Sequence, residues 1–144
     1  MLRTKDILDE KNPVLRTVSE EVVFPLTEKD KKTIDKMIEY LTNSQTEKLA
    51  LKYNLRPGMG LAAVQLGIPK RYIVIVHEEQ EGKFTNYVVI NPKLISYSEE
   101  MIYASAGEGC LSVNREVDGI IPRHARITIE GYDMLGQLIK IRAR

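Results

Sequence analysis

The stretch "RYIVIVHEEQEGKFTNYVVIN", Arg71–Asn91, decides the fold class of this chain. Its two arms, Arg71–Glu78 and Phe84–Asn91, are rich in β-branched and apolar residues, and a polar run with one glycine separates them. This pattern predicts an antiparallel hairpin. Downstream, "HARITIEGYD" and "GQLIKIRAR", joined by Met134–Leu135, predict a second hairpin. Between the two hairpins, "PKLISYSEEMIYAS" predicts an extended segment that bends near residues 98–100.

The residues before the first hairpin have a helical pattern. Thr27 is a suitable N-cap for a helix that runs to about Ser44, and acidic residues occupy its first turn. Apolar residues recur there with helical spacing and form one stripe: Ile34, Met37, Ile38 and Leu41. A shorter helix is predicted over Glu47–Tyr53, ended by Pro57–Gly58. We therefore expect an α+β fold in which antiparallel strands and hairpins pack around helices.

The composition limits the classes of protein that this chain can belong to. Its 144 residues fit one domain, residues 1–144, and a formal net charge of +1 gives no reason to expect binding to nucleic acid. No secretory signal and no apolar run long enough to span a membrane is present. A single cysteine excludes an internal disulfide and suits a reducing compartment, so we expect a cytoplasmic protein.

Two glycine-rich stretches carry the chemically informative residues. In "GMGLAAVQLGIP", residues 58–69, the glycines permit close backbone approach, and Gln65 offers an amide that both donates and accepts hydrogen bonds. Alternatively, this stretch is only a tight turn whose Gln65 ties down loop backbone. In "AGEGCLSVNREV", residues 106–117, Cys110 is the sole thiol and has polar and glycine neighbours. The alternative for Cys110 is a small, inert core residue.

The pair "GMGLAAVQ" and "EGCLS" resembles the first two signature motifs of peptide deformylases. These metal hydrolases remove the formyl group from the N-terminal formylmethionine of new polypeptides. The positions that match are Gly58, Gly60, Leu61, Ala62, Ala63, Gln65 and residues 108–112. Val64 departs from the proline that many relatives carry. The resemblance extends through "NPVLR", "NSQ", "INPK" and "RHARITI", and the insertion before the glycine motif is similar to type-2 deformylases.

The resemblance implies a role for each matched residue. It implies that Cys110 is a thiolate ligand of one divalent metal ion, usually Fe2+, which Zn2+, Ni2+ or Co2+ can replace. It implies that the Gln65 amide and the backbone N–H of Leu111 donate hydrogen bonds to the formyl oxygen. Residues expected along the cleft for N-formylmethionyl peptides are Gly58, Met59, Gly60, Glu108 and Gly109. The nascent chain on the ribosome would be the source of the substrate.

The family's third motif, HExxH, is absent from these residues. The only histidines are His77 and His124, and the alternating strand "LIKIRAR" runs to the last residue. We interpret the chain as a deformylase-like domain that lacks the C-terminal catalytic helix. We expect it to be inactive alone, to hold metal weakly or not at all, and to self-associate through its exposed last strand.

Two other functions remain open at this point. The first is a non-catalytic deformylase-like module that binds peptide N-termini or a ribosomal partner. The second is a cysteine hydrolase that pairs Cys110 with His124. The second is weakened because no acid or amide near His124 is evident that would orient its ring.

Overall fold

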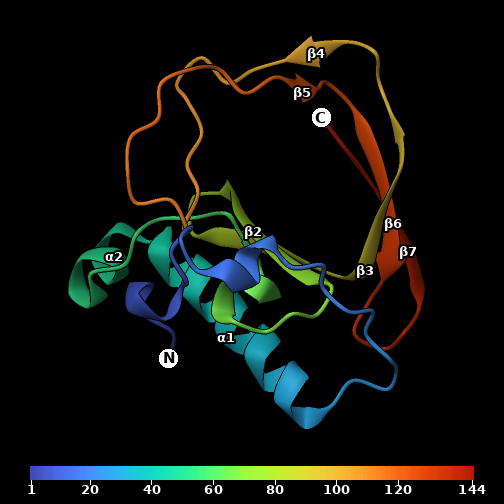
Figure 1. Ribbon diagram of the computed structural model, residues 1–144. Coiled ribbons are helices and arrows are strands. Elements are labelled where there is room, and N and C mark those ends of the chain that lie inside the picture. The colour runs from blue at the N-terminus through green and yellow to red at the C-terminus, as the bar shows by residue number, and fades with distance from the viewer.

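A computed structural model describes residues 1–144 and has an α+β fold, as expected (Figure 1). The helices are two short 3-10 turns η1 (Thr4–Asp6) and η2 (Pro13–Arg16), α1 (Glu28–Ser44), α2 (Glu47–Tyr53) and η3 (Ala63–Leu66). The strands are β1 (Gly60–Ala62), β2 (Tyr72–Gln80), β3 (Lys83–Tyr97), β4 (Met101–Ile102), β5 (Arg123–His124), β6 (Ile127–Tyr132) and β7 (Leu138–Ala143).

The main sheet has five antiparallel strands in the order β1-β2-β3-β6-β7, and β4 pairs with β5 separately. The first hairpin is confirmed, with Tyr72 opposite Ile90 and Gln80 opposite Lys83. The segment after Asn91 was expected as a separate extended stretch, but it continues β3 as far as Tyr97. The first part of β3 pairs with β2, and its later part pairs with β6. The register of the β3–β6 pair shifts between Ile90 and Lys93, next to Asn91, whose φ of 53° interrupts the regular strand.

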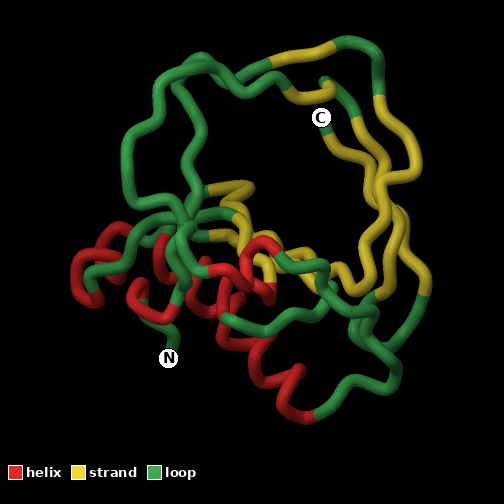
Figure 2. Tube along the Cα trace, in the orientation of Figure 1, coloured by secondary structure: helices red, strands yellow, loops and turns green.

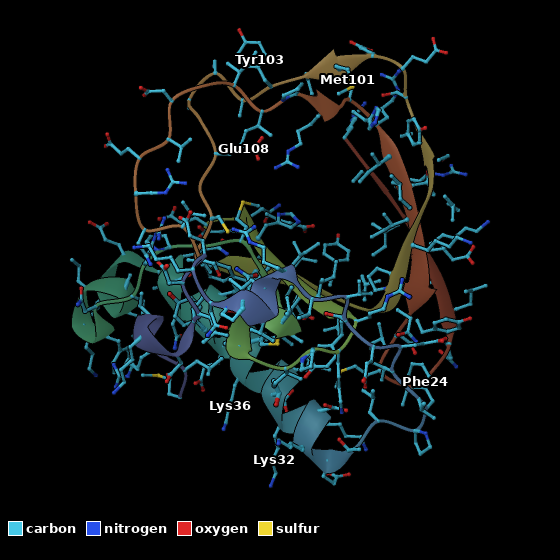
Figure 3. All side chains as sticks on the ribbon, in the orientation of Figure 1. Phe24, Lys32, Lys36, Met101, Tyr103 and Glu108 are labelled. Carbon is cyan, nitrogen blue, oxygen red and sulfur yellow. The ribbon has the colours of Figure 1, made fainter.

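Helix α1 covers one face of the sheet (Figure 1). The Thr27 hydroxyl accepts a hydrogen bond from the Asp30 N–H at 3.1 Å, which confirms the predicted N-cap. The sides that α1 and β2 turn toward each other are fully or almost fully buried: Ile34, Met37, Leu41, Tyr72, Val74 and Val76. On the opposite side of the helix, Lys32 and Lys36 point away from the sheet (Figure 3). The predicted amphipathic stripe therefore forms the core.

A buried polar cluster joins the start of α1 to the start of β2. Asp30 is only 4% exposed, and its two carboxylate oxygens accept hydrogen bonds from Lys70 Nζ at 2.9 and 3.2 Å. The Tyr72 hydroxyl, which is also buried, donates to Asp30 Oδ1 at 3.5 Å. Burial, followed by the negative charge of Asp30, raises the pKa of Tyr72 to about 12. Pairing with Lys70 compensates the burial of the Asp30 charge.

The second predicted hairpin, β6–β7, is also confirmed, with Ile129 opposite Ile141. This hairpin forms the end of the sheet opposite β1. A long loop connects β4 to β5 and returns toward the helices (Figure 2). That loop carries Cys110. His124 lies on β5 rather than on β6, because the chain changes direction at Ala125 and Arg126. None of the helices combines the length and apolar character needed to cross a membrane.

Candidate active site

The fold brings the glycine motif and the cysteine motif together at Gln65. This residue follows β1 in η3, and its Nε2 donates to Ser112 Oγ at 3.0 Å and lies 3.9 Å from Cys110 Sγ. Its Oε1 accepts the Ala62 N–H at 2.9 Å. Because a backbone N–H can only donate, this contact fixes the orientation of the amide and turns its NH2 group toward the cysteine motif.

Leu111 has a buried side chain and an unpaired backbone donor. The residue is 6% exposed and its side chain belongs to the main hydrophobic core. Its N–H donates no hydrogen bond to any group in the chain. This N–H is therefore available to a ligand near the oriented Gln65 amide. Gln65 Nε2 lies 3.9 Å from Cys110 Sγ and Leu111 follows Cys110 directly in the chain, so both donors lie close to the thiol.

The short strand β1 forms one edge of the sheet and leads directly to Gln65. Gly60 lies opposite Ile75, and Val76 N–H donates to the Met59 carbonyl at 2.8 Å. In an antiparallel pair the backbone groups alternate between inward and outward directions. Since the Met59 carbonyl points toward β2, the N–H and C=O of the next residue, Gly60, point away from β2. The edge at Gly60 is therefore free to bond an extended chain.

Glu108 and Gly109 lie on the loop before Cys110. Together with Cys110 they contribute to a cavity of about 690 Å³ that is lined by the loop between residues 104 and 123 and by Arg56. Arg123 holds the Glu108 carboxylate through three contacts, the shortest 2.6 Å from Nη2 to Oε1. Hydrogen bonding from Arg123 lowers the pKa of Glu108 below its ordinary value. Figure 3 shows Glu108 directed inward beneath β4.

The N-terminal segment 8–10 forms hydrogen bonds to both motifs. These contacts were not predicted from the sequence. Leu8 N–H donates to the Gln65 carbonyl at 2.8 Å, and Glu10 N–H donates to the Ser112 carbonyl at 2.7 Å. The Glu10 carboxylate also pairs with Arg115 at 2.9 Å, although the two residues are 105 positions apart. These bonds use backbone groups or exposed charges, which leave no distinctive sequence pattern. Segment 8–10 therefore acts as a strap across the site.

The residues around Cys110 do not fit a complete metal site. Cys110 is exposed, Gln65 is the only hydrogen-bonding partner of its Sγ, and no group of three metal-ligating side chains is present. A protein metal site of the zinc or iron type needs at least three such ligands. The chain thus supplies one sulfur ligand, and no reaction step through a metal follows from its residues alone.

Neither histidine is placed to assist Cys110. The His124 ring lies 4.3 Å from that of Tyr97, and its Nδ1 is 2.7 Å from the Ser98 carbonyl oxygen. His77 is stacked on Tyr87 with ring centroids 6.1 Å apart. The hydrogen bond between Cys110 and His124 that a cysteine hydrolase requires is not formed.

The chain is similar throughout its length to known proteins. The sequence model of the family described as polypeptide deformylase matches residues 4–144. Peptide deformylase 2 of Bacillus anthracis is 46% identical over 144 residues, which cover 100% of this chain and 78% of that relative. The peptide deformylase of Halalkalibacterium halodurans is 47% identical over 144 residues, with 100% of this chain and 79% of the relative covered.

Solved structures agree with the sequence match. The crystal structure of peptide deformylase from Thermotoga maritima superposes with a TM-score of 0.69 at 32% identity, covering 94% of this chain and 78% of that one. Peptide deformylases are hydrolases that remove the formyl group from nascent peptides, and the family is generally metal-dependent. With its two motifs in contact around Gln65 and a match over residues 4–144, the chain belongs to the polypeptide deformylase family.

Proposed function

We propose that this chain forms the formyl- and peptide-binding part of a peptide deformylase site, with N-formylmethionyl peptides as its substrate. The observation that carries this proposal is the placement of two donors beside Cys110: the oriented Gln65 amide and the unpaired N–H of Leu111. Both would donate to the formyl oxygen. Removal of one such donor typically costs about 3 kcal/mol of transition-state stabilisation.

The edge of β1 would bind the peptide backbone. The outward N–H and C=O of Gly60 suit addition of one extended strand to the sheet. Gly58 allows the close packing that brings this edge toward the cysteine motif, and Met59, which is 58% exposed, would contact the substrate's methionine side chain. Glu108 and Gly109 would line the cleft beside Cys110.

Cys110 would be the only metal ligand that these residues supply. In the family the ion is usually Fe2+, and Zn2+, Ni2+ or Co2+ can replace it. A single thiolate without imidazole partners binds such ions weakly. We therefore expect far less than one metal ion per chain and negligible hydrolysis by the chain alone.

The test measures binding and turnover separately. Calorimetry with formyl-Met-Ala-Ser should give saturable binding to the chain, weaker binding of unformylated Met-Ala-Ser, and no release of formate. Gln65→Ala should weaken binding of the formylated peptide selectively, because it removes one of the two formyl donors. Cys110→Ser should leave this metal-free binding almost unchanged.

Two results would contradict the proposal. Equal affinity for the formylated and unformylated peptides would show that no formyl site exists. Efficient formate release with one metal ion per chain, measured by elemental analysis, would require ligands other than those identified at Cys110.

A non-catalytic module is the second candidate, favoured by the incomplete ligand set around Cys110. Such a module would bind peptide N-termini or a ribosomal partner without turnover. Co-sedimentation with ribosomes, together with equal affinity for both peptides, would favour it over the first candidate. A cytoplasmic location, self-association through β7 and the absence of direct nucleic-acid binding remain predictions.

A further inference from the structure

The stretch "NSQ", Asn43–Gln45, lies where α1 ends and has no role in the chemistry proposed above. Gln45 Nε2 donates to the Gly58 carbonyl at 2.9 Å and to the Val76 carbonyl at 2.7 Å. Because both partners are carbonyl oxygens, the amide nitrogen must face them. One side chain thus joins the turn before β1 to strand β2.

Ser44 completes this arrangement on the other side of Gly58. The Ser44 hydroxyl is almost fully buried; it accepts the Gly58 N–H at 3.2 Å and donates to the Leu41 carbonyl at 2.9 Å. Two residues earlier in the turn, the Arg56 carbonyl accepts the Tyr40 hydroxyl at 2.9 Å. The end of α1 therefore binds both polar backbone groups of Gly58 and one of Arg56.

The two hydrogen bonds of the Gln45 side chain are not needed to cap the helix. The backbone N–H of Gln45 already bonds to the carbonyls of Asn43 and Thr42 within the last turn. The Gln45 side chain is thus free to bond elsewhere, and both of its hydrogen bonds go to the backbone around β1. The N–H of Val76 donates to the Met59 carbonyl, and the carbonyl of Val76 accepts from Gln45. Gln45 therefore contacts the backbone at the point where the pairing of β1 with β2 begins.

The geometry assigns Ser44 and Gln45 as positioning residues for the peptide-binding edge. They hold Gly58 by its N–H and C=O, and this sets where Met59 and Gly60 lie along β2. The functional part of this inference rests on the proposed binding of peptide at β1. The structural part, that Gln45 fixes the backbone of residues 58–60, does not depend on any ligand.

The experiment compares Gln45→Ala and Gln45→Glu with the wild-type chain. Gln45→Glu keeps the shape of the side chain but loses both donors, so both variants should behave alike. The matched control is Thr46→Ala, because the Thr46 hydroxyl bonds only to the Thr42 carbonyl, at 3.1 Å, and does not touch Gly58. Hydrogen exchange of single amides is measured by NMR, and affinity for formyl-Met-Ala-Ser by calorimetry.

In both Gln45 variants we expect amide exchange at Leu61 and Val76, whose N–H groups face the partner strand, to rise about tenfold while protection in β3 and β6 stays unchanged. Affinity for the formylated peptide should fall roughly tenfold, since a displaced β1 edge weakens its backbone hydrogen bonds to the peptide. Thr46→Ala should change neither quantity.

The outcomes separate this inference from the proposed function. If the wild-type chain binds no peptide, the proposed function fails, while the exchange measurement still tests the role of Gln45. Unchanged exchange at Leu61 and Val76 in Gln45→Ala would overturn the inference, as would wild-type behaviour of Gln45→Glu. A uniform loss of protection across the whole sheet would also overturn it, because Gln45 would then act on global stability.

Discussion

Gly58 lies directly against Leu111, so the glycine motif and the cysteine motif are packed together. A Cβ atom placed on Gly58 would lie 2.7 Å from Leu111 Cδ1 and 3.0 Å from its Cγ, closer than such atoms approach. The backbone of Gly58 does not have a positive φ. Glycine is therefore required at this position because a larger residue would not fit. The side chain that fills the space is that of Leu111, the residue whose N–H is unpaired.

Replacement of Gly58 by alanine should destabilise the chain by about 1–3 kcal/mol, because the new methyl group must displace a buried leucine. Urea unfolding followed by circular dichroism measures this change. The control is Gly60→Ala, whose Cβ would meet nothing closer than the Val74 carbonyl oxygen at 3.9 Å. We expect the control to change stability by less than about 0.5 kcal/mol. Equal losses in the two variants would contradict the packing argument.

Much of the fold could be predicted because its signals are local. The N-cap Thr27, the apolar stripe of α1 and the helix Glu47–Tyr53 all depend on residues a few positions apart, and each was confirmed. The same holds for the two hairpins, whose alternation and turns lie within short windows. The resemblance to deformylases likewise came from two short motifs, and residues 4–144 match that family.

The remainder depends on contacts between distant residues. The continuation of β3 beyond Asn91 follows from its pairing with β6, which no local pattern specifies. The strap at residues 8–10 reaches partners such as Asn114 across 105 positions. The role of Gln45 was also hidden, because its two acceptors are backbone carbonyls that any residue would provide.

The buried Tyr72 makes stability depend on pH in the alkaline range. The pKa of Tyr72 is raised from 10.0 to about 12 in the folded chain, by burial first and by the Asp30 charge second. Between these values the unfolded chain loses the phenol proton and the folded chain keeps it, so the free energy of unfolding falls as pH rises. Below about pH 10 this contribution should be constant.

Tyr72→Phe isolates this effect, because the variant cannot ionise at this position. Urea unfolding at a series of pH values should show a smaller alkaline loss of stability in Tyr72→Phe than in the wild-type chain. The control is Tyr103→Phe, which alters an exposed phenol that points outward from the β4 region (Figure 3). Parallel pH profiles for wild type and Tyr72→Phe would show that the raised pKa does not affect stability.

The pair Glu108–Arg123 should order the loop that follows Cys110 without stabilising the fold as a whole. Exposed ion pairs contribute little to global stability, but this one closes the loop between its two members. Glu108→Gln should leave the urea midpoint unchanged and raise the fast backbone mobility of residues 109–121, measured as lower NMR order parameters. The double variant Glu108→Arg with Arg123→Glu should restore the wild-type order parameters. Equally low order parameters in both variants would show that the pair does not order the loop.

Strand β7 forms the second edge of the sheet, and its charge should control self-association. The outer backbone groups of β7 have no partner strand, so two chains can pair there edge to edge. Such pairing brings the Lys140 and Arg142 side chains of two copies together, and their repulsion is screened by salt. Sedimentation velocity should therefore show weak association that strengthens with salt. Arg142→Glu should associate already at low salt, whereas Lys36→Glu, with the same change in net charge on α1, should not. Monomers under every condition, or equal behaviour of the two variants, would exclude pairing through β7.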